Sequence, residues 1–295
     1  MRGRRITTSM TGTTTIKPEM LFSHLDPEIE VGTYPLFRHF PEISHFVTLR
    51  GTVVPDDPFS SFNLGRHSGE DLSRVMKNRD RLCRALSLPS SALVQPRQVH
   101  GNEVLPLLPD FFSLTDEAQA EYLSQADGLV TALPGVCVAI STADCVPLLF
   151  YDPCRRVVGA AHAGWRGTVG HIARKTVEAM HRVYGSDPRD IYAAIGPSIG
   201  RPAFQVGDEV VEAFREAYPG EVPVVSPCRD DEGRHHVDLW EANRADLLSS
   251  GIIGGHLSLA AICTYARNDL FFSSRRARGK NFGRFLSGIF LHNDE

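Results

Sequence analysis

Three short stretches of this sequence place chemically capable side chains beside strongly apolar runs. They are residues 97–101 (RQVHG), 141–145 (STADC) and 161–168 (AHAGWRGT). A polar side chain that is buried without a partner costs a few kcal/mol, so residues that interrupt apolar strands are expected to have one. His100, Cys145 and His162 together offer one thiolate and two imidazoles. Zn²⁺ accepts this donor set and keeps a fourth tetrahedral position for water or substrate.

Each of these residues also has a plainer explanation when it is taken alone. His100 is then better explained as a structural histidine with a satisfied hydrogen bond, and Cys145 as a packed thiol in a turn. Positions 100, 145 and 162 stand 45 and 17 residues apart, which matches no local metal-binding motif. A Cys–His nucleophile pair without a metal therefore stays open beside the zinc site.

The elements that would position these residues follow from apolar periodicity. A helix is predicted over 71–86 with Asp71 as N-cap, and another over 168–184. Asp238 and Glu241 form a capping-box pattern that opens a third helix. Strands are predicted over 136–140, 146–151, 157–161 and 191–195, and a short helix over 208–218. Cys145 then lies between two strands, and His162 begins a strand–loop–helix junction, where open α/β sheets bind ligands.

Composition narrows the class of protein. The chain has 295 residues, 42% hydrophobic and 22% charged, as in ordinary globular domains. A net charge of −4 gives no reason to expect nucleic acid as a partner, and no apolar run approaches the roughly 18 residues that cross a bilayer. The start lacks the apolar core of a secretory signal, and the six cysteines form no C-x-x-C pair, so reduced thiols in a cytoplasm are expected.

The domain organisation is expected to be simple. Interleaved strands and helices predict a mixed α/β fold, of α+β sandwich-like type, in one catalytic domain over residues 36–295. Residues 1–35 are predicted to be a flexible tail and lead-in, with an expression remnant or a misassigned start as the alternative for the first residues.

Short motifs that recur in one order along the chain carry a recognisable pattern. They are 63–65 (NLG), 98–101 (QVHG), 127–128 (DG), 142–147 (TADCVP), 162–167 (HAGWRG), 195–197 (IGP), 263–264 (CT), 272–273 (FS) and 275–276 (RR). Taken together, these motifs resemble the bacterial purine nucleoside phosphorylase family once called multicopper polyphenol oxidoreductases or laccase-domain proteins. The similarity runs in order from about residue 59 to residue 289. Residues 201–207 and 278–284 depart from the family's pattern, which affects the rim of the nucleoside pocket that the resemblance implies.

This resemblance implies a fold similar to a cysteine-hydrolase-like toxin domain and a catalytic zinc ion. His100, Cys145 and His162 match the family's ligand positions, which makes Cys145 mainly a ligand and only secondarily a nucleophile. The implied reactions are phosphorolysis of adenosine, inosine and methylthioadenosine, and hydrolytic deamination of adenosine. The implied partners are therefore purine nucleosides and phosphate.

Roles for the neighbouring residues follow as hypotheses. Asp144 is the candidate to move protons, with orientation of a partner as the alternative. Arg166, with the helix start behind it, is expected to hold phosphate. The remaining candidates for substrate binding are Asn63, Arg66, His67, Arg97 and Gln98. Arg275, Arg276 and Arg284 are weaker anion-binding candidates, since a solvated basic surface explains them equally well.

Three rival functions remain at this point. A copper-dependent phenol oxidase is the older interpretation of the family, and one Cys with two His also suits copper. That chemistry needs several copper ions, however, and the sequence shows no dense His-x-His clusters. A metal-free Cys–His hydrolase and a non-catalytic nucleoside-binding or partner-binding protein are the other two.

Overall fold

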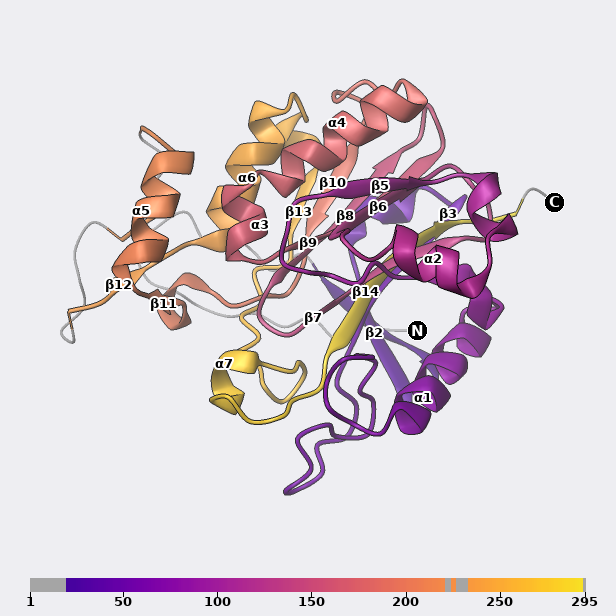
Figure 1. The fold of residues 1–295 in the computed structure, drawn as a ribbon, viewed down its shortest axis with the longest axis horizontal. Helices are drawn as coiled ribbons and strands as arrows, with labels where there is room; N and C mark the ends of the chain where they lie inside the picture. Colours follow the sequence, from indigo (N-terminus) through magenta and orange to yellow (C-terminus); the bar gives the residue numbers. More distant parts are fainter. Residues whose placement is uncertain (1–19, 221–223, 227–232, 294–295) are drawn as a thin grey trace.

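Two six-stranded sheets packed face to face form the centre of the protein (Figure 1). The computed structural model describes residues 20–220, 224–226 and 233–293. The first sheet has the order β1 (Leu21–Asp26), β2 (Ile29–Thr33), β3 (Ile43–Thr48), β14 (Phe285–Leu291), β7 (Cys137–Thr142) and β4 (Leu93–Val94). The second has the order β13 (Leu257–Leu259), β10 (Tyr192–Ile195), β8 (Val146–Asp152), β9 (Val157–Ala163), β6 (Gly128–Thr131) and β5 (Val104–Leu107). A small separate pair joins β11 (Gln205–Val206) to β12 (His235–His236).

The central strands are buried on both faces, which explains their continuous apolar runs. Successive side chains of a strand point to opposite faces. In β7, Ile140 therefore contributes to the core between the sheets, together with Leu149 of β8, whereas Ala139 faces outward towards a helix. Every residue of β7, β8 and β9 is buried.

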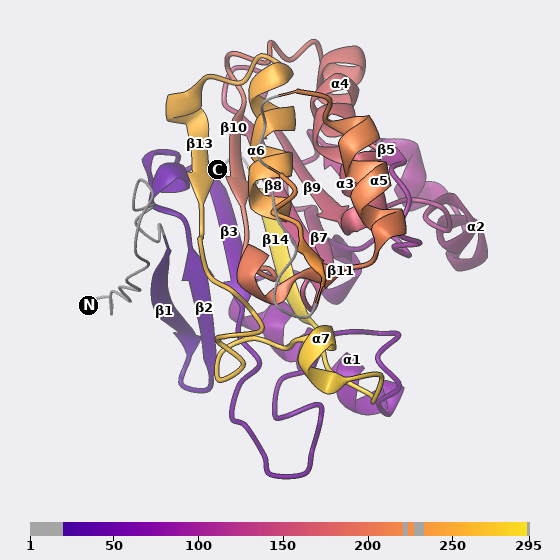
Figure 2. The same ribbon diagram turned by 90° about the vertical axis from the view of Figure 1, so that its left-hand side faces the viewer.

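Helices cover the outer face of each sheet. α1 (Leu72–Ala85) packs on the first sheet, and α4 (Ile172–Tyr184) and α6 (Leu239–Ser249) pack on the second. Figure 2 shows α5 (Asp208–Ala217) and α3 (Trp165–Val169) beside them on the same side. The shorter elements are α2 (Asp116–Tyr122), α7 (Ser274–Ala277) and the 3₁₀ turns Pro35–His39, Ser90–Ala92, Pro109–Ser113, Arg201–Ala203 and Gly254–His256. The mixed α/β sandwich expected from the sequence is confirmed.

Most predicted elements are present near their expected bounds, but the prediction of one continuous helix over 168–184 is wrong. The prediction over 168–184 corresponds to two helices, α3 and α4, which are separated at His171. His171 has φ 57°, and its Nδ1 lies 2.9 Å from Oδ1 of Asp246. A left-handed residue cannot continue a right-handed helix, so the chain changes direction there. Both N-caps are as predicted, since Asp71 accepts from the Ser73 N–H and Asp238 from the Glu241 N–H. The predicted capping box is only half formed, because the Asp238 N–H donates to the carbonyl oxygen of Val224 and the Glu241 carboxylate accepts from Arg244 instead.

The beginning of the chain contributes to the first sheet. Residues 1–19 of the predicted tail lie outside the described residues. Within the predicted lead-in, β1 and β2 pair with each other, and β2 pairs with β3 through Val31↔Thr48. None of the described helices is long and apolar enough to cross a membrane. The described cysteines carry free thiols, and Cys228 lies outside the described residues.

Candidate active site

The candidate ligands come together at one end of the sandwich. His162 belongs to β9 and is paired with Pro147 of β8. Cys145 directly precedes β8, so this pairing places it beside the end of β9. His100 lies in the loop between β4 and β5. Three segments that are distant in sequence thus meet at one rim, because the two sheets bring their strand ends together.

The three side chains are close enough to form one centre. The ligand atoms of His100, Cys145 and His162 all lie within 4.8 Å of one another. The two imidazole rings have their centroids 4.8 Å apart and are tilted by 71°. His162 is buried, Cys145 is partly exposed and His100 is exposed. The centre therefore opens to solvent on the side of His100.

Asp127 holds both histidines in place and is absent from the site predicted from sequence. Its Oδ1 lies 2.7 Å from Nδ1 of His162 and accepts the His100 N–H at 3.0 Å. Its Oδ2 accepts the N–H groups of Val99 and Gly101 at 3.0 and 2.8 Å. Nδ1 of His162 is engaged, which leaves Nε2 for the centre. The only sequence signal for this residue was its place in the Asp127–Gly128 motif.

Two glycines permit the close approach of the loops around the centre. A Cβ at Gly164 would lie 2.9 Å from Nδ1 of His100 and 3.2 Å from Sγ of Cys145. A Cβ at Gly167 would lie 2.9 Å from the carbonyl oxygen of Gly101. Any larger residue at either position must displace a candidate ligand or the loop that carries one.

Electrostatics favour an ionised sulfur. Burial alone would raise the pKa of Cys145, but the charge of His162 and hydrogen bonds from His100 and His162 lower it to about 6. Burial alone would lower the pKa of His162, but the Cys145 thiolate and the Asp127 carboxylate raise it to about 9. A thiolate beside an imidazolium is the expected pair, and the thiolate is both the nucleophilic form and the metal-binding form of cysteine.

The carboxylate of Asp144 points into the segment that follows β13. Its Oδ1 accepts from the Thr264 hydroxyl at 2.7 Å, and its Oδ2 accepts from the Ser273 hydroxyl at 3.0 Å and the Arg275 N–H at 2.6 Å. Burial raises the pKa of Asp144. Its φ of 89° is costly for a residue other than glycine, and the three hydrogen bonds hold it there. Asp144 thus fastens this segment to the turn that carries Cys145.

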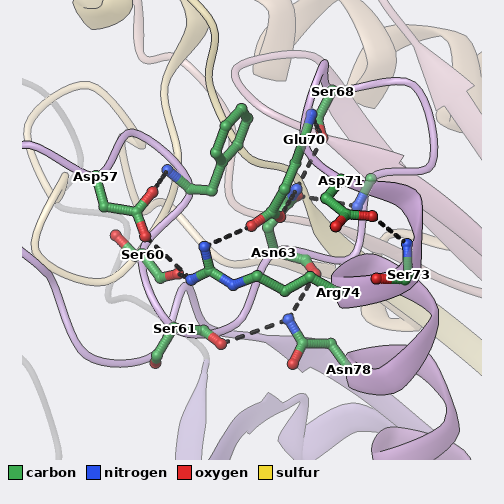
Figure 3. A network of polar contacts seen from close by, with 12 residues as sticks. Asp57, Ser60, Ser61, Asn63, Ser68, Glu70, Asp71, Ser73, Arg74 and Asn78 are labelled. Carbon is green, nitrogen blue, oxygen red and sulfur yellow. Dashed lines mark hydrogen bonds and ion pairs between the residues drawn. The ribbon is translucent and has the colours of Figure 1, made fainter.

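The side-chain amide of Asn63 is fully hydrogen-bonded within the protein (Figure 3). Nδ2 donates to the Ser68 hydroxyl and to the Glu70 carboxylate, each at 2.7 Å. Oδ1 accepts the Gly65 N–H at 3.0 Å and the Arg284 N–H at 2.7 Å. Asn63 therefore joins the loop before α1 to the start of β14.

The amide of Gln98 is engaged in the same way. Nε2 donates to the carbonyl oxygen of Ser141 at 2.8 Å, and Oε1 accepts the Ser141 N–H at 2.9 Å. Oε1 also accepts from Nε2 of Gln95 at 2.9 Å. These bonds dock the loop that carries His100 onto the end of β7, and they hold Gln98 at φ 61°.

Most of the remaining charged candidates lie near one another, on the loop before α1, the loop that carries His100 and the start of β14. Arg66, His67 and Arg97 are exposed. The pKa of His67 is lowered, first by partial burial and then by the positive charges of Arg97, Arg66 and Arg284. Arg284, only a weak candidate from sequence, lies close enough to Cys145 for the thiolate to oppose the lowering of its pKa by burial.

Arg166 stands apart from this group on α3. Its side chain is exposed, and its Cζ lies 4.2 Å from the ring centre of its neighbour Trp165. α3 has only five residues, so the helix start behind Arg166 offers a much smaller dipole than the long helix expected from the sequence.

The chain is similar over most of its length to proteins of one family. The family described as multi-copper polyphenol oxidoreductase laccase matches residues 44–292. A purine nucleoside phosphorylase from Bacteroides thetaiotaomicron is 41% identical over 259 residues, which are 88% of this chain and 95% of that protein. Adenosine deaminase RL5, from an unknown prokaryotic organism, is 39% identical over 264 residues, or 89% and 99% of the two chains.

A solved structure shares the fold. The crystal structure of YlmD from Geobacillus stearothermophilus superposes with a TM-score of 0.80 at 36% identity. The match covers 92% of this chain and 99% of that chain. The family match over residues 44–292 includes all the segments that meet at the rim.

Proposed function

The chain belongs to the family described as multi-copper polyphenol oxidoreductase laccase. From the names of its relatives and from its His/Cys cluster we propose that it is a zinc-dependent purine nucleoside phosphorylase. Its substrates are adenosine, inosine and methylthioadenosine together with phosphate, and it also deaminates adenosine in the cytoplasm. The observation that carries the proposal is the cluster of His100, Cys145 and His162, whose ligand atoms lie within 4.8 Å of one another.

The residues present fit a zinc ion. Cys145 favours its thiolate form, and Asp127 occupies Nδ1 of His162 and directs Nε2 inward. His100, Cys145 and His162 would hold the ion with three protein donors, a number that leaves room for water or substrate, and His100 is exposed to solvent. When bound, zinc supplies a Lewis acid and lowers the pKa of a bound water to roughly 7.

The residues around the centre have distinct proposed roles. Asp127 orients both histidines from one buried carboxylate. For Asp144 we favour a positioning role over a proton-moving role, because three donors already occupy its oxygens. Asn63 and Gln98 support the substrate pocket by fixing its loops. Arg166, which is exposed on α3, is proposed to contact the substrate.

Two observations keep other functions testable. The family description names copper, and one Cys with two His can bind it. Among the described residues, however, one His/Cys/acidic cluster has ligand geometry, whereas laccase chemistry needs several copper ions. The thiolate–imidazolium pair of Cys145 and His162 also suits a metal-free hydrolase.

The decisive experiment incubates protein of measured metal content with adenosine, with and without phosphate, and identifies the products. Adenine, hypoxanthine and ribose 1-phosphate should form only with phosphate, and inosine should accumulate when phosphate is absent. Turnover without oxygen separates this activity from phenol oxidation, and loss of turnover with a chelator separates it from metal-free hydrolysis.

A pair of cysteine variants controls that experiment. Cys145→Ala should lose zinc and both activities. Cys263→Ala, which changes a partly exposed thiol bonded to the Gly200 N–H at 3.2 Å, should keep them. The proposal fails if Cys145→Ala retains its zinc and both reactions.

A further inference from the structure

Arg284 is held rigidly against the loop before α1, on the side of the centre where Cys145 lies. Its Nη1 donates to the carbonyl oxygen of His67 at 2.7 Å, and its Cζ lies 5.3 Å from the ring centre of Phe282. A Cβ at Gly65 would lie 2.8 Å from Cβ of Arg284, so only glycine admits this packing. Within the described residues, Nε and Nη2 of Arg284 make no hydrogen bond, which leaves two donors available to a ligand.

Apart from the Cys145 thiolate, the charges that act on this part of the site are positive. Arg66 and Arg97 act electrostatically on His67, together with Arg284. No carboxylate in the described ranges forms an ion pair with any of these three arginines. Like charges held together repel one another, and the burial of Arg284 adds a desolvation cost. A bound anion would therefore stabilise this group of arginines by offsetting both the repulsion and the desolvation cost.

A buried arginine beneath the same loop adds to the positive potential. Arg79 of α1 is 5% exposed, and its Nη1 donates to two neutral oxygens, the Leu64 carbonyl at 3.1 Å and Oε1 of Gln95 at 2.9 Å. Burial, and next the charge of Arg66, lowers the pKa of Arg79 to about 10. A buried cation is costly unless an opposite charge lies near. Both hydrogen-bond acceptors of Arg79 are neutral, and the charge of Asp80 offsets only part of the effect of burial on its pKa.

From this arrangement we infer that Arg66, Arg97 and Arg284 form a subsite for a tetrahedral oxyanion beside Cys145, which holds inorganic phosphate as the co-substrate. The inference rests on the proposed function for its use of phosphate, but the binding site itself does not depend on turnover. Arginine suits this role because its planar donors match two oxygens of one phosphate.

The reaction that such a subsite serves is balanced without further reactants. An oxygen of hydrogenphosphate attacks C1′ of the ribose, and the bond from C1′ to the purine nitrogen N9 breaks. The electron pair of that bond goes to the purine, which takes up the proton that hydrogenphosphate releases. The products are the free base and ribose 1-phosphate. Deamination consumes only water and releases ammonia, so it does not need the oxyanion.

The test uses the full zinc-loaded protein and the double variant Arg66→Gln/Arg97→Gln. Both side chains are exposed and make no hydrogen bond to the described residues, so the fold should persist. The dissociation constant for inorganic phosphate, measured by calorimetry, should rise at least tenfold. The ratio of phosphorolysis to deamination should fall at least tenfold at fixed phosphate. Sulfate should compete with phosphate, because it has the same shape and charge.

Matched variants make the outcome interpretable. Arg182→Gln removes an exposed arginine on α4, outside the proposed subsite, and should leave phosphate binding unchanged. Arg284→Lys keeps the charge but loses the planar fork, and should weaken phosphate binding to an intermediate degree. A phosphate dissociation constant within twofold of wild type in the double variant would overturn the inference. If no nucleoside is turned over, the calorimetric result still decides the subsite, while the proposed function alone fails.

Discussion

Replacing Asp127 by Asn should weaken zinc binding more than any other change outside the three ligands. Each oxygen of the Asp127 carboxylate accepts two hydrogen bonds. Oδ1 accepts from the His100 N–H and from Nδ1 of His162, and Oδ2 accepts from the N–H groups of Val99 and Gly101. An Asn side chain keeps one acceptor oxygen and turns an NH₂ group towards the other pair. Two hydrogen bonds to a charged group are lost, and the new NH₂ group then faces two other hydrogen-bond donors.

The magnitude follows from these contacts. Each hydrogen bond to a charged group contributes about 1.5–3 kcal/mol, so the free energy of unfolding should fall by about 3 kcal/mol or more. Loss of a partner that orients a metal ligand typically lowers metal affinity by about 10–100-fold. Because the bonds of Asp127 position both His100 and His162, the effect on zinc should lie towards the upper end of that range.

The assay is competition for zinc between metal-free protein and a chelating indicator, with urea unfolding measured in parallel. Asp246→Asn is the matched control, because Asp246 is 1% exposed and its carboxylate lies 2.9 Å from Nδ1 of His171. The control should lose comparable stability and keep its zinc affinity. Zinc affinity of Asp127→Asn within twofold of wild type, or an equal loss in the control, would refute the reasoning.

Three further outcomes are expected. Gly164→Ala should lower zinc affinity at least tenfold, because its Cβ would lie 2.9 Å from Nδ1 of His100. The free energy of unfolding should change little, because the His100 ring is exposed. Gly255→Ala, whose Cβ would meet nothing within 4 Å, is the control for both measurements. Between pH 6 and 9 zinc affinity should rise about tenfold per pH unit, since His162 (pKa about 9) must lose its proton while Cys145 (pKa about 6) is already ionised. Calorimetry in buffers of different ionisation enthalpy should show about one proton released, and a flat pH profile would contradict this. Asp144→Asn should reduce phosphorolysis and deamination by the same factor, whereas loss of deamination alone would indicate a proton carrier.

The sequence predicts the local elements well and the long-range pairing poorly. β7, β8 and β9 are apolar runs bounded by turns, and α1 has an N-cap and an apolar face, so each can be recognised without its neighbours. The placement of β14 between β3 and β7 has no local signal, because it depends on pairing across most of the chain. The break before α4 depends on the contact of His171 with Asp246, which periodicity cannot show.

The same division applies to the candidate site. The ligand types and the family motifs select His100, Cys145 and His162, and the structure brings their ligand atoms together. Asp127 could not be assigned from sequence, because its role depends on four donors that lie 26–35 residues away. Arg284 was only a weak candidate for a similar reason, since its contacts with the loop before α1 span more than 200 residues.

The most direct test of the central claim is a zinc titration of metal-free protein in which phosphorolysis and deamination are measured at every point. The account predicts that both activities rise together, reach their maximum at one zinc per chain, and stay at background in Cys145→Ala. Full turnover in the metal-free protein, or activity that appears only with copper, would contradict it.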